Sequence, residues 1–73
     1  MNTYKIEITD TFSEEANFSW IKRYTIKANS VLGAIRKASR LTGYRFKINY
    51  VNMDCARYDA KNACVCAFIT SEF

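Results

Sequence analysis

The spacing of the apolar residues in one segment of the chain predicts a helix. This segment is Ser30–Gly43 (SVLGAIRKASRLTG). Its apolar residues recur at spacings of three and four residues, which places them on one side of an α-helix. This stripe comprises Val31, Ala34, Ile35, Ala38, Leu41 and Thr42. Asn29 or Ser30 can cap the first turn, because a short side-chain oxygen accepts hydrogen bonds from the free backbone N–H groups there. Gly43 suits the left-handed position that follows a helix, so the segment predicts the one helix of the chain.

The segments before and after this helix alternate between apolar and polar residues, a period of two that is typical of half-buried strands. Five strands are predicted, at Tyr4–Thr9, Phe18–Ala28, Tyr44–Val51, Cys55–Tyr58 and Ala63–Thr70. Lys22 interrupts the alternation, so we expect the second strand to begin with a bulge or an unpaired stretch. The third strand is expected to be half-buried, with one face formed by Tyr44, Phe46, Ile48 and Tyr50.

The remaining segments are polar and predict connections. Asp10–Asn17 predicts a long loop between the first two strands, which we expect to form an antiparallel hairpin. Turns are predicted at Asn52–Asp54 and Asp59–Asn62, and Ser71–Phe73 is predicted to be a loose tail. The expected fold is therefore α+β: an antiparallel sheet of about five strands with one helix packed on one face, in the order strand, strand, helix, strand, strand, strand.

The length of 73 residues predicts a single domain over residues 1–73. No run of about 18 apolar residues is present, and the first residues lack the pattern of a signal peptide. Three cysteines, an odd number, are typical of a reducing compartment. We therefore expect a cytoplasmic protein that has no membrane partner.

The net charge of +4 is distributed unevenly along the chain. The segment from Ala16 to Met53 contains eight Lys or Arg residues and no Asp or Glu, which indicates an anionic partner. The alternative is an ordinary solvated surface. The candidate binding residues are Lys5, Arg23, Lys27, Arg36, Lys37, Arg40, Arg45 and Lys47.

These cations are expected on opposite sides of a thin domain. Arg36, Lys37 and Arg40 should point outward from the helix, and the other five should lie on the sheet face away from it. A flat ligand could then use only one of the two sets. The sheet face is favoured, because several strands would add aromatic and threonine contacts to its cations.

The sequence contains no histidine, which excludes serine–histidine and cysteine–histidine catalysis within this chain. It also lacks a glycine-rich phosphate loop. We therefore expect no enzymatic activity, no catalytic residue and no cofactor.

The three cysteines leave several interpretations open. Cys64 and Cys66 share one face of their strand, and Cys55 would lie opposite Cys66 if a two-residue turn fell at Ala60 and Lys61. The thiols could then be small core residues, a Cys55–Cys66 disulfide, or a redox or metal group. The core role is favoured because the paired cysteine motifs of zinc sites are missing, so no metal site is predicted.

Three stretches of the chain together resemble short accessory proteins encoded by phages and prophages. They are YKIEITDTF, SWIKRYTIKANSVLGAIRKASRLTGYRF and ARYDAKNACVCAFI. Anti-CRISPR proteins are similar in being very small, free of catalytic motifs, and built from a few strands and one helix. The resemblance implies a stoichiometric inhibitor that binds a host nuclease or effector complex, a protein or ribonucleoprotein, and blocks nucleic-acid access. Anti-CRISPR proteins share no common motif, so the resemblance assigns no functional residue.

Other interpretations of the binding surface stay open. The protein could instead be a direct nucleic-acid-binding module that uses a basic sheet or helix face. The acidic stretch Asp10–Glu15 could contact a basic partner. Apolar residues such as Val51 or Met53 could pair edge strands into a homodimer.

Overall fold

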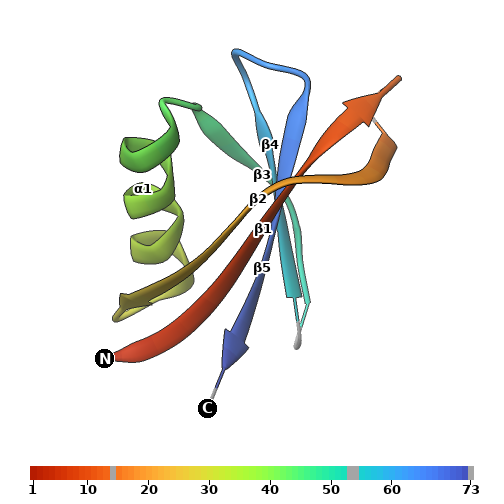
Figure 1. The fold of residues 1–73 in the computed structure, drawn as a ribbon. Helices are drawn as coiled ribbons and strands as arrows, with labels where there is room; N and C mark the ends of the chain where they lie inside the picture. Colours follow the sequence, from red (N-terminus) through yellow and green to blue (C-terminus); the bar gives the residue numbers. More distant parts are fainter. Residues whose placement is uncertain (14, 53–54, 73) are drawn as a thin grey trace.

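The computed structural model describes residues 1–13, 15–52 and 55–72, which form one sheet and one helix (Figure 1). The elements are β1 (Asn2–Phe12), β2 (Glu15–Ala28), α1 (Val31–Thr42), β3 (Phe46–Val51), β4 (Cys55–Ala60) and β5 (Val65–Glu72). The strands lie in the order β2-β1-β5-β4-β3, and every neighbouring pair is antiparallel. The predicted α+β class, a mostly antiparallel sheet with one helix, is confirmed over the described residues.

Helix α1 begins and ends where the capping residues predict. The Ser30 Oγ accepts a hydrogen bond of 3.0 Å from the Gly33 N–H. Gly43 has a φ of 80°, in the left-handed region, and its N–H donates to the Ser39 carbonyl at 2.8 Å. Ser30 therefore satisfies a free donor of the first turn, and the Gly43 N–H satisfies a free carbonyl of the last turn.

The helix covers only one end of the sheet, since it packs mainly against β2 and less against β1. Its buried residues are Ala34, Ile35 and Ala38. The prediction that Leu41 belongs to the buried stripe is wrong, because this side chain is 63% exposed. Leu41 lies beside the edge of β2, near Ile26 and Lys27, rather than between the helix and the sheet.

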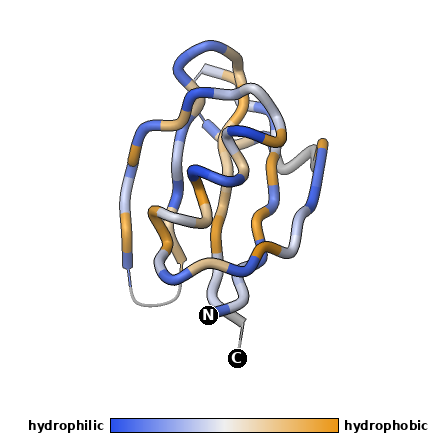
Figure 2. The backbone as a smooth tube through the Cα atoms, turned by 90° about the vertical axis from the view of Figure 1, so that its left-hand side faces the viewer, coloured by the Kyte–Doolittle hydropathy of each residue, from blue (hydrophilic) through white to orange (hydrophobic). Residues whose placement is uncertain are grey.

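The core lies between α1 and the sheet face built from alternate residues of the strands. Its largest buried side chains are those of Tyr4, Ile6, Ile8, Ile26, Ile35, Tyr58 and Ile69. Figure 2 shows the helix in front of the sheet, with hydrophobic and hydrophilic positions alternating along the strands behind it. No described helix is long and apolar enough to cross a membrane.

The first hairpin is longer and tighter than predicted. Residues Asp10–Asn17 do not form a loop, since β1 continues to Phe12, which pairs with Glu15 in β2. Ser13 has a φ of 52°, a conformation that suits two-residue hairpin turns. Polar residues suit this end of the hairpin because it lies outside the buried core, and even Phe12 is exposed. Of the bulge or unpaired stretch predicted near the start of β2, the bulge is confirmed, because Lys22 pairs with Ile8 and Trp20 with Thr9, which leaves one extra residue between them.

Strand β3 differs from its prediction in burial and in alternation. The strand begins at Phe46, not Tyr44, and only Phe46 is partly buried. Ile48 is 56% exposed because α1 does not extend over this end of the sheet. A register shift after Ile48 sets Tyr50 opposite Arg57 of β4, so the extra residue inverts the predicted alternation and Tyr50 does not share a face with Ile48.

The turn between β4 and β5 falls two residues later than predicted. Residues 61–64 form it, so β4 reaches Ala60, and Asp59, not Cys55, lies opposite Cys66. Cys55 instead pairs with Thr70, and none of the three cysteines forms a disulfide. The Cys55–Cys66 disulfide is therefore wrong, because the register separates these residues along neighbouring strands.

The ends of β3, β4 and β5 also refine the predicted connections. Asn52 donates its N–H to the Cys55 carbonyl and accepts from the Cys55 N–H on its Oδ1, each at 2.9 Å, as a tight turn requires. The rest of that predicted turn, Met53 and Asp54, lies outside the described residues. The predicted tail is wrong at Ser71, which pairs with Tyr4 in the sheet; Phe73 lies outside the described residues.

Candidate binding site

Two cations of the outer sheet face, Lys5 and Arg23, share one acidic partner, Glu7 of β1. Arg23 of β2 lies opposite Glu7 of β1, and its Nε donates to the Glu7 Oε2 at 2.8 Å. Lys5 lies 3.9 Å from the other oxygen of the same carboxylate. The acid-free segment of the sequence therefore folds against an acid that precedes it in the chain. The sheet face is less basic than the sequence predicts.

A second ionic cluster lies on the same outer face of the sheet, at strand β4. The Arg57 Nε donates to Asp59 Oδ1 at 2.9 Å, and the Asn49 side-chain amide donates to Asp59 Oδ2 at 2.8 Å. Although burial lowers the pKa of Arg57, the hydrogen bond and charge of Asp59 outweigh it and raise that pKa above its ordinary value. The Arg57 guanidinium also lies 5.9 Å from the centre of the Phe68 ring. This cluster orders the surface and leaves Asp59 with both oxygens engaged.

Cys66 lies next to this cluster and is fully buried. Burial raises the pKa of its thiol, and the positive charge of Arg57 offsets part of that effect. The thiol is therefore protonated at neutral pH, as a small packing residue would be. Within the described part of the chain, no group of three or more His, Cys, Asp and Glu side chains could hold a metal ion.

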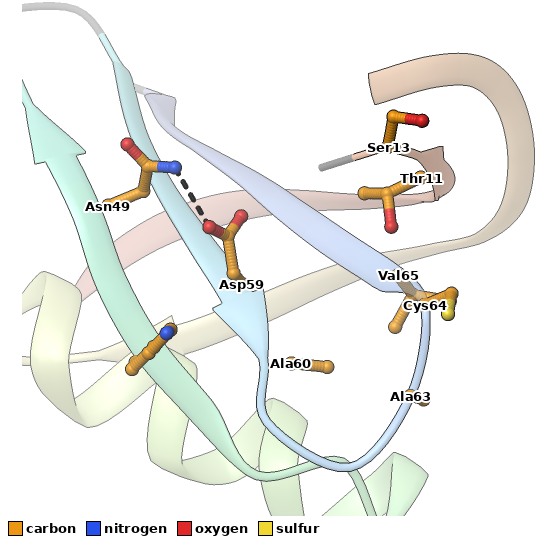
Figure 3. Close-up of a pocket in the computed structure, with 9 residues that line it drawn as sticks. Thr11, Ser13, Asn49, Asp59, Ala60, Ala63, Cys64 and Val65 are labelled. Atoms are coloured by element: carbon orange, nitrogen blue, oxygen red, sulfur yellow. Dashed lines mark hydrogen bonds between the residues drawn. The ribbon is translucent and has the colours of Figure 1, made fainter. Parts of the chain in front are cut away.

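A hollow of about 550 Å³ opens beside Asp59, between β3, the β4–β5 turn and the end of the first hairpin (Figure 3). We call it the Lys47 hollow. Its polar lining comes from Thr11, Ser13, Lys47, Asn49, Asp59 and Cys64. Lys47 is the only one of the predicted binding residues that lines this hollow. The lining mixes a cation, a carboxylate and neutral hydrogen-bonding groups, so it does not select one charge of ligand.

A second depression, of about 480 Å³, lies between α1 and the edge strand β2. We call it the α1–β2 groove. It is lined by Thr25, Ile26, Lys27, Lys37, Arg40 and Leu41. Three of these six residues are cations and none is an acid, so the groove carries one sign of charge. No ion pair within the described residues involves any of the three cations.

One of the lining side chains, that of Lys37, is held in place by a hydrogen bond to β2. Its Nζ donates a 2.6 Å hydrogen bond to the backbone carbonyl of Lys27. The bond also covers an outward-facing carbonyl of β2, which is an edge strand of the sheet. An ammonium group has three N–H donors, so two of them remain to donate hydrogen bonds to an anion in the groove.

The structure therefore brings together three of the predicted binding residues that we expected on opposite sides. Lys27 joins Lys37 and Arg40 because β2 is the edge strand beside α1. The sequence carries no signal for which strand is the edge, so it could not group them. The lining residues that were not predicted are Thr25, Ile26 and Leu41, of which the helical period assigns Leu41 to the core.

The remaining predicted binding residues lie elsewhere. Arg36 is exposed on α1 and does not line the groove. Arg45 precedes β3, and its backbone N–H donates to the Asn62 Oδ1 at 2.9 Å. In the acidic stretch, Asp10 accepts hydrogen bonds from Thr9 and Asn17, while Glu14 lies outside the described residues.

Comparison with known proteins found no matching family model, no matching curated protein and no matching solved structure.

Proposed function

We propose that this protein is a small non-enzymatic binding protein that holds an anionic partner in the α1–β2 groove. The observation that carries the proposal is the convergence of Lys27, Lys37 and Arg40, from two elements, on one groove without an acid. Such a field attracts anions and disfavours cationic partners. The two free donors of Lys37 strengthen the proposal, because a donor that is already oriented loses less freedom on binding.

We place the partner among host nuclease or effector complexes. The support for this step is the resemblance of the sequence to phage-encoded accessory proteins, of which anti-CRISPRs are one kind. The protein would bind stoichiometrically and block nucleic-acid access. The absence of histidine from the chain supports binding over catalysis.

The test is DNA cleavage by a panel of purified CRISPR nuclease complexes in the presence of increasing amounts of this protein. A stoichiometric inhibitor stops cleavage at about one protein per complex, and Lys37→Gln or Arg40→Gln raises the amount required. The matched control is Lys61→Gln, which removes the same charge from the β4–β5 turn and should inhibit like the native protein. Inhibition at amounts far below the complex, or unchanged inhibition by both groove variants, would contradict the proposal.

The second candidate is direct binding of nucleic acid through the same groove. It is favoured by Arg36, which adds a further exposed cation to α1 beside the groove. If the three groove cations each neutralise one phosphate, the logarithm of the binding constant falls with the logarithm of salt at a slope of about −2 to −3. Fluorescence anisotropy with labelled DNA and RNA at two salt concentrations measures this slope. A slope near zero, or no binding at low salt, would exclude the candidate.

A further inference from the structure

The lining of the α1–β2 groove indicates what kind of anion fits it. We infer that its occupant is an extended acidic peptide segment of a partner protein, with apolar residues between its carboxylates. This inference rests on the proposed function, because it names the chemistry of the partner that the groove holds. Besides its three cations the groove presents Leu41, which is 63% exposed, whereas the side chain of Ile26 is buried in the core.

The apolar part of the lining favours a peptide over a nucleic acid as the ligand. Proteins that bind single strands stack bases on aromatic side chains, and none of the six groove residues is aromatic. A phosphodiester backbone would leave Leu41 in contact with solvent or with charged oxygens. An aliphatic side chain of a peptide buries that surface, which favours association.

The shape of the site also matches an extended segment. The groove follows β2 through Thr25, Ile26 and Lys27, and is bounded on its other side by α1. In an extended peptide the side chains at i and i+2 point the same way and lie roughly 7 Å apart. Carboxylates on one side of the segment can therefore reach the Lys37 ammonium, which lies against β2, while the residues between them point the other way, towards Leu41 on α1.

The experiment uses fluorescence polarisation with three labelled peptides. GSELELEGS carries the proposed pattern, GSNLNLNGS lacks its charges, and GSESESEGS lacks its apolar residues. We expect the first to bind about tenfold more tightly than the second, since each Glu contributes a charge-assisted hydrogen bond that Asn does not. We expect the third to bind several-fold more weakly than the first, because the contact with Leu41 is lost.

Variants of the protein assign the site. Lys37→Gln and Arg40→Gln should each weaken binding of GSELELEGS about tenfold, and Leu41→Ser several-fold, with the circular dichroism spectrum unchanged. Lys61→Gln should stay within twofold of the native protein, since this exposed residue lies in the β4–β5 turn. Equal binding of the three peptides, or equal losses in all four variants, would overturn the inference.

A labelled ten-nucleotide DNA strand completes the experiment. If the DNA binds more tightly than GSELELEGS and the groove variants weaken it, the peptide inference is wrong while the groove and the proposed function stand. If neither probe binds and the groove variants inhibit nuclease complexes like the native protein, the proposed function fails as well.

Discussion

Two isoleucines on the helix-facing side of the sheet should differ sharply in what they contribute to stability. Ile6 is completely buried at the centre of β1, between Tyr24 of β2 and Ile69 of β5. Ile6→Ala should cost about 4 kcal/mol, near the upper part of the range for such truncations. The whole domain is expected to have a free energy of unfolding of roughly 4 to 11 kcal/mol, so this loss is a large fraction.

Ile48→Ala is the matched comparison, because the same atoms are removed from β3, where the side chain is 56% exposed. It should cost less than about 1 kcal/mol, since most of that surface already contacts water. Thermal unfolding followed by circular dichroism measures both. The expected decreases in Tm are roughly 15–30 °C for Ile6→Ala and under about 8 °C for Ile48→Ala. Similar decreases would refute the conclusion that α1 covers only one end of the sheet.

Further predictions concern the helix ends and the thiols. Ser30→Ala should lower the free energy of unfolding by about 1 kcal/mol in urea titrations, because the first turn loses its cap. Gly43→Ala should lower it by about 1–2 kcal/mol in the same assay, since a side chain at a φ of 80° is strained. Ellman's reagent should modify the exposed Cys64 in the folded protein and Cys66 only on unfolding. Burial raises the folded pKa of Cys66 above its unfolded value, so the protonated thiol stabilises the folded state fully below about pH 8.5. This contribution to the free energy of unfolding is lost as the pH rises further. Cys66→Ala should therefore weaken the decline of the urea midpoint at alkaline pH.

The local features of the fold could be predicted because short-range physics decides them. Ser30 and Gly43 set the ends of α1 through hydrogen bonds and backbone conformation within a few residues. The alternation in β1 fixes which side chains enter the core, since a shift of one residue would expose all of them. The interruption of the alternation at Lys22 indicated the bulge in β2 for the same reason: an extra residue reverses the face on which the following side chains lie.

The features that failed depend on contacts between distant segments. The helical period places Leu41 on the buried stripe, but how far the stripe is covered depends on which strands lie beneath it. The pairing of Asp59 with Cys66 depends on the turn at residues 61–64, and its shift by two residues rules out the Cys55–Cys66 disulfide, one of the interpretations that the sequence left open.

The candidate site was predicted as a set of residues but not as a place. All three groove cations were among the eight predicted binding residues. Their grouping was missed, because the Lys37 side chain reaches the Lys27 carbonyl only when β2 is the edge strand. The neutralisation of Arg23 by Glu7 was missed too, since the acid comes from a different segment of the chain than the acid-free stretch.

Amide chemical shifts can show whether the α1–β2 groove is the binding surface of this protein. We would record ¹⁵N–¹H correlation spectra of the labelled protein during a titration with GSELELEGS. If the groove binds the peptide, the amides of residues 25–27 and 37–41 should shift progressively, and those of the Lys47 hollow should stay unchanged. Shifts centred on Lys47 and Asn49, or no shifts in the groove, would show that the α1–β2 groove is not the binding surface.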